Sequence, residues 1–300
     1  MMTTPQTSHE PLLEPEFLRK LERVAIVAKS VHLGMNKGER RSKRKGISIE
    51  FADYRDYVQG DDLRFVDWNI FSRLDDLYLK LFREQEDLTL HLLIDASASM
   101  GFGAPSKVAF ACKLAAALGY VALVGYDRVS VAAFSSMGET SLAPCRGKAS
   151  AHKLFCFIQS VQAQGATELD HTCRSYVARN RGRGVAVLLT DFFDEAGFEG
   201  PLRRLLQTGS DLYAIHVLAP EEIDPPVVGD LKLVDSETHA FTEISVSRTL
   251  IKRYKQNLQG FCESIRRFCT ARRITYVPAS TDTPFERLIL DVLRRGGMLQ

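Results

Sequence analysis

Oxygen-bearing side chains gather at three places where the sequence pattern ends a strand or joins two helices. Asp95, Ser97 and Ser99 follow the apolar run 88–94, Thr167 stands in the loop 165–167, and Asp191 follows the apolar run 185–189. These groups supply carboxylate and hydroxyl oxygens without sulfur or imidazole, a ligand set suited to a hard cation such as Mg²⁺ or Mn²⁺. We therefore predict a divalent metal site built from these five residues.

The spacing after the first strand suits such a site. Because residues alternate, the side chains of Asp95, Ser97 and Ser99 can turn toward a common point. Hydroxyl ligands leave the charge of the ion uncancelled. With Asp95 and Asp191 holding it directly or through water, the ion stays electrophilic toward an added acidic ligand. The alternative is that these side chains only cap helices, as Ser and Asp often do at strand-to-helix turns.

Enzymatic alternatives find less support in the motifs. An Asp-nucleophile phosphatase needs a second acid two residues after its nucleophile, and Ser97 stands at that position. The sequence contains neither a Walker A motif nor G-x-S-x-G. The alternative that stays open is a Mg²⁺- or Mn²⁺-dependent hydrolase using the same site, with His171 near Thr167 as its candidate acid or base. We expect a chain that is not an enzyme.

The elements that must position these residues alternate from residue 88 onward. Period-two and apolar runs predict strands at 88–94, 129–134, 140–143, 185–189, 212–217 and 274–277, and a hairpin at 231–234 and 241–246. Helical spacing predicts helices at 105–124, 149–162, 168–179, 198–207, 247–271 and 284–294. This alternation is typical of a doubly wound, mostly parallel α/β sheet, in which ligands bind beyond the carboxyl ends of the strands.

The chain divides into three predicted parts. Residues 1–13 are polar and form an expected disordered tail, and residues 14–87 combine a helix at 14–33 with a β-rich segment at 47–86. Residues 88–300 form the α/β domain. Arg55, Arg64 and Arg73 alternate with acidic residues, which predicts either an ion-pair network that fixes the segment 47–86 to the main domain or a partner-docking surface. The basic run 37–45 has no interleaved aromatic residues, so we expect a solvated loop and no nucleic-acid binding.

Composition excludes several broad classes. The 300 residues are 45% apolar and 25% charged with a net charge of +2, which gives no global attraction to nucleic acid or to an anionic membrane. Six cysteines without a C-x-x-C pair predict buried free thiols in a reducing cytosol. The polar N-terminus lacks the apolar core of a signal peptide. The stretch 108–126 is weakly hydrophobic for a membrane span, so we expect a core helix and a cytoplasmic location.

The five site residues resemble the metal-ion-dependent adhesion site, or MIDAS, of von Willebrand factor A-type domains, whose pattern is D-x-S-x-S, then Thr, then Asp. The stretch 46–68, with Gly60-Asp61-Asp62 and Asp67-Trp68, resembles the signature of the bacterial domain of unknown function 58 family. The resemblance continues over roughly residues 14–295. It implies a von Willebrand factor A-like fold with a small N-terminal helical and β-rich appendage.

The resemblance also implies a function. It predicts metal-dependent protein–protein interaction through Mg²⁺ (or Mn²⁺), with an acidic residue of the protein ligand completing the coordination of the ion. The expected partner is a MoxR-type AAA+ ATPase, for which this chain would serve as an adaptor or a chaperone-like companion. Many members of the family carry N-terminal membrane helices. No such helix is recognisable in this sequence, so we expect no integral membrane segment.

Overall fold

The computed structural model describes residues 12–22, 49–59, 61–84, 89–180, 184–226, 229–234, 241–285 and 289. The chain forms two compact units, the larger made of residues 1–32 and 88–300 and the smaller of residues 33–87. The disordered tail predicted at 1–13 falls almost wholly outside the described residues. So do the later part of the first predicted helix, the basic run 37–45 and most of the final predicted helix.

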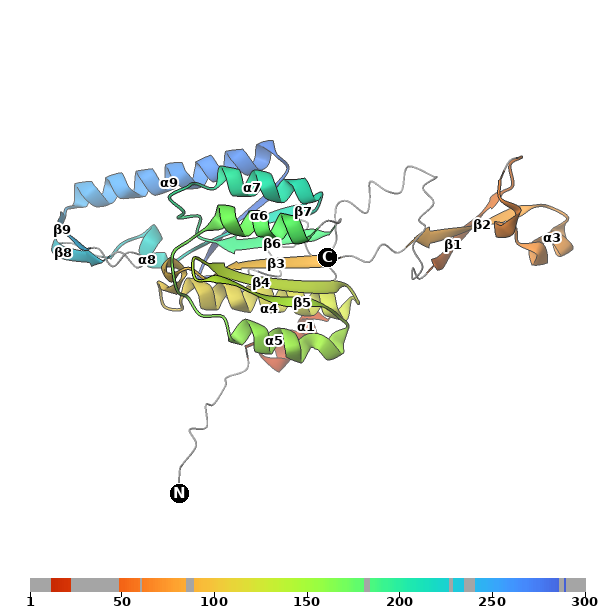
Figure 1. The fold of residues 1–300 in the computed structure, drawn as a ribbon, viewed down its shortest axis with the longest axis horizontal. Coiled ribbons are helices and arrows are strands. Elements are labelled where there is room, and N and C mark those ends of the chain that lie inside the picture. The colour runs from red at the N-terminus through yellow and green to blue at the C-terminus, as the bar shows by residue number, and fades with distance from the viewer. Residues whose placement is uncertain are drawn as a thin grey trace, which may run out of the picture. The chain divides into compact units, whose positions relative to one another are not determined.

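A six-stranded sheet forms the centre of the larger unit (Figure 1). Its strands lie in the order β10-β7-β6-β3-β4-β5, and only the edge strand β5 runs antiparallel to its neighbour. The strands are β3 (Thr89–Asp95), β4 (Arg128–Ser135), β5 (Gly138–Arg146), β6 (Val185–Thr190), β7 (Asp211–Leu218) and β10 (Thr275–Ser280). β6 is buried along its whole length, because helices cover both faces of the sheet.

Helices pack on the two faces (Figure 1). One face carries α1 (Pro15–Leu21), α4 (Lys107–Val124) and α5 (Ala151–Gln159), and the other carries α6 (Leu169–Arg179), α7 (Glu199–Leu205) and α9 (Arg248–Ala271). Successive residues of a strand point to opposite faces, so Leu92 and Ile94 enter the first core and Leu93 the second. The arrangement confirms the predicted α/β fold class, a doubly wound and mostly parallel sheet.

α4 is buried along nearly its whole length. It starts at the N-cap Ser106, whose hydroxyl accepts a hydrogen bond from Ala109 N at 3.3 Å. Gly119 lets α4 approach α5 closely, because an added Cβ there would meet Leu154 Cδ2 at 2.6 Å. Within the part of the chain that the structure describes, α4 is the one helix long and apolar enough to cross a membrane. Buried residues make up 78% of it, as in the core helix of a folded domain.

α1 belongs to the larger unit. Phe17 and Leu21 are buried in the core that includes α4. The residue after the helix, Glu22, accepts a hydrogen bond from Tyr120 Oη at 2.8 Å and pairs with Lys148 Nζ at 2.7 Å. The sequence grouped this helix with the β-rich segment. Its apolar side chains instead complete the core of the α/β domain, a contact that no local pattern reveals.

Two connections differ from the predicted pattern. β5 has nine residues rather than a short strand at 140–143, because it pairs with β4 along most of its length. Between β7 and the predicted hairpin, where the sequence predicts no helix or strand, lies a short helix, α8 (Pro220–Ile223), with proline at its first position. The hairpin that follows is confirmed as β8 (Gly229–Val234) paired with β9 (Phe241–Val246).

The smaller unit is a two-stranded sheet with one short helix. β1 (Ile49–Asp56) pairs antiparallel with β2 (Tyr78–Glu84), which confirms the predicted β-rich segment. Asp67 is the N-cap of α3 (Trp68–Leu74), and its carboxylate accepts hydrogen bonds from Asn69 N and Ile70 N. Two ion pairs lie in the turn between β1 and α3. They join Arg55 to Asp61 at 2.7 Å and Arg64 to Asp62 at 2.6 Å. Both ion pairs lie within this unit, so they do not provide the predicted attachment of the segment 47–86 to the main domain.

The six cysteines are free thiols, as predicted. Cys112 and Cys269 are buried, and their burial raises the pKa of each thiol to about 12. Cys173 is buried too, whereas Cys156 is exposed on α5. The buried thiols act as small apolar side chains, because a high pKa keeps them protonated.

Candidate metal centre

The carboxyl ends of β3 and β6 lie side by side in the middle of the sheet. The parallel register pairs Ile94 with Leu189, so Asp95 and Thr190 follow at the same edge. Along the chain, β3 leads to β4 on one side, whereas β6 leads to β7 on the other. The two connections leave in opposite directions, and such a reversal is where doubly wound sheets bind ligands. Asp95 and Asp191 flank this point.

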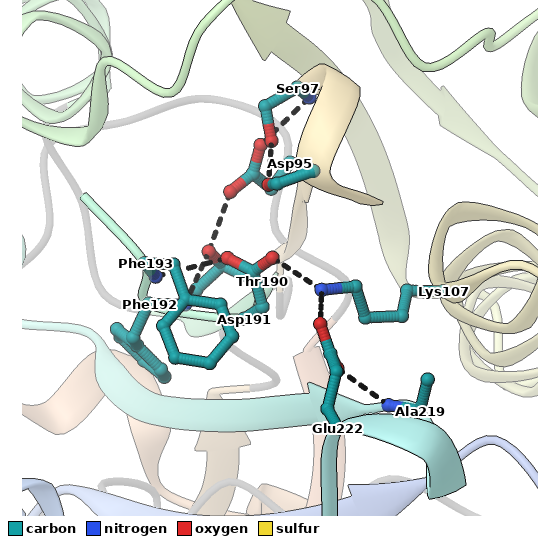
Figure 2. A network of polar contacts seen from close by, with 10 residues as sticks. Asp95, Ser97, Lys107, Thr190, Asp191, Phe192, Phe193, Ala219 and Glu222 are labelled. Atoms are coloured by element: carbon teal, nitrogen blue, oxygen red, sulfur yellow. Dashed lines mark hydrogen bonds and ion pairs between the residues drawn. The ribbon is translucent and has the colours of Figure 1, made fainter. Parts of the chain in front are cut away.

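Asp95 is a buried carboxyl group that has no compensating cation among the described residues. It is 0% exposed, and its carboxylate accepts hydrogen bonds from Ser97 N at 3.0 Å and from Thr190 Oγ1 at 2.6 Å (Figure 2). No described lysine, arginine or histidine forms an ion pair with it. Burial, and secondly the charge of Asp191, raise the pKa of Asp95 from 3.8 to about 7. A bound cation would oppose this shift, because it favours the ionised form.

The hydroxyl groups come from two neighbouring loops. Ser97 Oγ and Ser99 Oγ lie 3.0 Å apart in the turn after β3. Thr167 is buried in a loop that is bonded to this turn, because Ala98 N donates to Gly165 O at 2.7 Å. Gly165 has a φ of +75°, and an added Cβ would meet Ser136 Oγ at 2.7 Å, so glycine permits the loop to pack here. The structure thus brings the predicted loops together at one edge of the sheet.

Asp191 has a cationic partner. Its Oδ1 accepts a hydrogen bond from Phe193 N at 3.0 Å, and its Oδ2 pairs with Lys107 Nζ at 2.7 Å (Figure 2). The same ammonium pairs with Glu222 Oε1 at 2.6 Å, and Glu222 Oε2 accepts a hydrogen bond from Ala219 N at 2.8 Å. The side chain of Lys107 is 1% exposed, so its charge is held by these two carboxylates rather than by water.

The charges of this cluster do not balance. Asp95, Asp191 and Glu222 are three carboxylates, and among the described residues Lys107 is the one ammonium paired with any of them, through Asp191 and Glu222. When all four groups are ionised, the cluster has a formal charge of minus two, which one divalent cation would neutralise. Neutral hydroxyl ligands stand beside it. The residues present therefore fit a hard divalent cation, which prefers carboxylate and hydroxyl oxygens.

Sequence reasoning missed Lys107 and Glu222, and it noted Thr190 only as the neighbour of Asp191. A signal for Lys107 was present, because it occupies the first position of a helix that is otherwise almost wholly apolar. The partial positive charge of a helix N-terminus disfavours a cation there. A lysine at this position therefore requires nearby carboxylates.

Histidine and cysteine contribute little to the candidate centre. His171 is exposed on α6, and no hydrogen bond joins it to the five predicted residues among those that the structure describes. Over the same described ranges, no group of three or more His, Cys, Asp or Glu residues is placed to hold a metal ion. A metal centre here depends on the hydroxyl groups of Ser97, Ser99 and Thr167 to complete its ligand set.

Curated relatives and solved structures resemble the chain over most of its length. Uncharacterized protein Rv1480 of Mycobacterium tuberculosis is 26% identical over 242 residues, which are 79% of this chain and 76% of the relative. Uncharacterized protein Mb1516 of Mycobacterium bovis matches with the same values. Both relatives share the larger part of their length with this chain.

Among solved structures, the conserved hypothetical protein BatB of Bacteroides thetaiotaomicron is 13% identical and has a TM-score of 0.43. The match covers 70% of this chain and 98% of BatB. The SpRpn10 VWA domain is 10% identical with a TM-score of 0.37, over 68% of this chain and 94% of the domain. Likeness at this level carries no conclusion about function. Residues 53–260, more than half of the chain and parts of both units, match the family described as Protein of unknown function DUF58, and the chain belongs to that family.

Proposed function

We propose that the chain is a metal-dependent protein–protein interaction module. The observation that carries this proposal is the buried carboxylate of Asp95, which lies near Asp191 and has no compensating cation among the described residues. In the proposal, Asp95 and Asp191 hold Mg²⁺ or Mn²⁺ directly or through water. Ser97, Ser99 and Thr167 supply neutral oxygens. The bound ion would supply an electrophilic centre that accepts one further oxygen ligand.

The further ligand in this proposal is a carboxylate of a partner protein. Hydroxyl ligands leave part of the charge of the ion uncompensated, so an acidic side chain is favoured at the remaining position. From the family resemblance, we propose a MoxR-type AAA+ ATPase as the partner and an adaptor or chaperone-like role for this chain. Any ATP hydrolysis in such an assembly would be carried out by the partner, since the sequence of this chain has no Walker A motif.

A metal-dependent hydrolase at the same site would need a positioned base. His171 is exposed and has no hydrogen bond to the cluster. His216 is fully buried; its Nδ1 lies 2.8 Å from Tyr276 Oη, and burial lowers its pKa to about 4. The predicted base, His171, is thus not held in place beside Asp95 or Asp191. The binding function is therefore the better supported of the two.

The test uses the purified chain and the purified MoxR-type ATPase of the same organism. We expect capture of the ATPase in Mg²⁺, release by EDTA, and weaker capture by Ser97→Ala. If the carboxylate of the partner joins the ion, the partner should tighten Mg²⁺ binding by the same factor by which Mg²⁺ tightens partner binding. EDTA-insensitive binding, combined with Mg²⁺- or Mn²⁺-supported phosphatase or phosphodiesterase turnover that His171→Ala abolishes, would overturn the proposal.

A further inference from the structure

Lys107 stands where a cation is intrinsically unfavourable. It is the first residue of α4, and the N-terminus of a helix carries partial positive charge. It is also fully buried, and burial of an ammonium requires full compensation by ion pairs or hydrogen bonds. Local preference and burial both oppose lysine at this position. A residue that breaks local rules in this way is expected at a functional or strained position.

Two carboxylates offset the unfavourable position of Lys107. Its Nζ lies 2.7 Å from Asp191 Oδ2 and 2.6 Å from Glu222 Oε1, so the ammonium bridges the candidate metal centre and α8 (Figure 2). Glu222 is itself fixed, since its side chain accepts from Ala219 N at 2.8 Å and its carbonyl accepts from Tyr254 Oη at 2.9 Å. Lys107 thus has a second anchored acceptor beside Asp191.

We propose that Lys107 sets the metal affinity of the candidate centre: its ammonium is a resident cation on Asp191, and a divalent ion binds by displacing it onto Glu222. This inference rests on the proposed function, because it assigns the metal to the cluster of Asp95 and Asp191. A divalent ion beside Asp191 repels the ammonium that shares this carboxylate. Glu222 receives the displaced charge, so Lys107 stays compensated in both states.

The ammonium of Lys107 should weaken the binding of a divalent ion at Asp191. An ammonium bonded to a ligand carboxylate lowers the affinity of that carboxylate for a second cation. At a separation of a few ångströms and an effective dielectric constant near 20, a unit charge contributes several kcal/mol. Removing the charge of Lys107 should therefore tighten Mg²⁺ binding. A lysine that only orients Asp191 would give the opposite result, because its loss would release the ligand.

The experiment measures Mg²⁺ affinity by calorimetry on the full chain and on Lys107→Met, which keeps most of the length of the side chain. We expect Mg²⁺ to bind at least about tenfold more tightly to the variant. Mg²⁺ should also raise the melting temperature of the variant more than that of the wild type, because three carboxylates are left without a cation. Lys113→Met is the matched control, since Lys113 is an exposed lysine of the same helix. It should leave Mg²⁺ affinity unchanged.

The outcomes separate this inference from the proposed function. If the wild type binds Mg²⁺ and Lys107→Met binds it equally or more weakly, the role given to Lys107 is overturned and the metal centre stands. If neither chain binds Mg²⁺, both proposals fall. If only the variant binds Mg²⁺, the lysine excludes the metal from the wild type. That result supports Lys107 as the residue that limits metal affinity, and it overturns both the displacement onto Glu222 and a resident metal in the wild type.

Glu222→Gln is a second variant that stays informative if Lys107→Met fails to fold, because unchanged Mg²⁺ affinity in it would by itself overturn the transfer of Lys107 to Glu222. Glu222→Gln removes the acceptor of the displaced ammonium and should weaken Mg²⁺ binding. Plain loss of a negative charge gives the same sign, so the double variant Lys107→Met/Glu222→Gln is measured where it folds. Transfer of Lys107 to Glu222 predicts a smaller effect of Glu222→Gln in the Lys107→Met background. Unchanged Mg²⁺ affinity in Glu222→Gln, or equal effects in the two backgrounds, would overturn the transfer.

Discussion

Strand β3 carries a buried polar side chain near each of its ends, and the two are paired in different ways. His91 is 8% exposed, its Nδ1 lies 2.7 Å from Ser130 Oγ, and its ring packs against Tyr176. Burial lowers the pKa of His91 to about 4, so the ring is neutral at physiological pH. Asp95, four residues later, is fully buried and sits near a second carboxylate.

The difference shows which buried polar groups point to a ligand. A buried imidazole can lose its proton and become neutral. The ring of His91 then forms a hydrogen bond with one hydroxyl group, and no charge remains. The carboxylates of Asp95 and Asp191 keep excess negative charge unless a proton or a cation is taken up. Burial alone is therefore a poor guide to function on this strand. The balance of charge around the group separates the structural His91 from the candidate site at Asp95.

Asp95→Asn should produce the largest change. The substitution removes one carboxylate ligand, and we expect Mg²⁺ affinity to fall by about a hundredfold or more, equivalent to some 2.7 kcal/mol. In the absence of metal, the same change should raise the free energy of unfolding at pH 8 by about 1–3 kcal/mol, because a buried charge near Asp191 is gone. Calorimetry and thermal unfolding measure the two effects. Mg²⁺ binding at wild-type affinity would remove Asp95 from the site.

Ser97→Ala and Thr167→Ala should have intermediate effects. Each removes one neutral oxygen ligand and leaves the charge of the cluster unchanged. We expect Mg²⁺ affinity to fall by about tenfold for either variant, which corresponds to roughly 1.4 kcal/mol. Ser136→Ala serves as a control, because Ser136 supports the neighbouring loop through a hydrogen bond to Ala166 N and is not a predicted ligand. An equal loss in the control would mean that loop placement, rather than ligation, is being measured.

Much of the fold could be predicted because its signals are local. Apolar runs marked the parallel strands, and helical spacing marked α4 and α9 within a few residues of their observed bounds. The length of β5 could not be predicted, because it depends on pairing with β4 and Pro144 weakens the strand signal. α8 has four residues, too few to show a helical period.

The candidate site was predictable only in part, for a related reason. The pattern of Asp95, Ser97 and Ser99 is contained in one turn and can be read directly. Lys107 meets Asp191 across 84 positions and Glu222 across 115, so their pairing follows from the packing of α4 and α8 at one edge of the sheet. A sequence pattern shows which groups could ligate a metal. It does not show which cation already stands beside them.

His91→Gln should have the smallest effect on the site and so completes the comparison along β3. The folded pKa of His91, about 4, lies below its ordinary value of 6.5, so between these values the unfolded chain binds more protons. The contribution of His91 to stability is present above pH 6.5 and is lost as the pH falls through 4. Glutamine does not titrate, so His91→Gln should reduce the loss of unfolding free energy between pH 6.5 and 4 by about 1–2 kcal/mol. His216 is also buried with a lowered pKa, so part of the pH dependence of stability should remain in this variant. Mg²⁺ affinity should stay at the wild-type value, and a tenfold loss would show that the two ends of β3 are coupled.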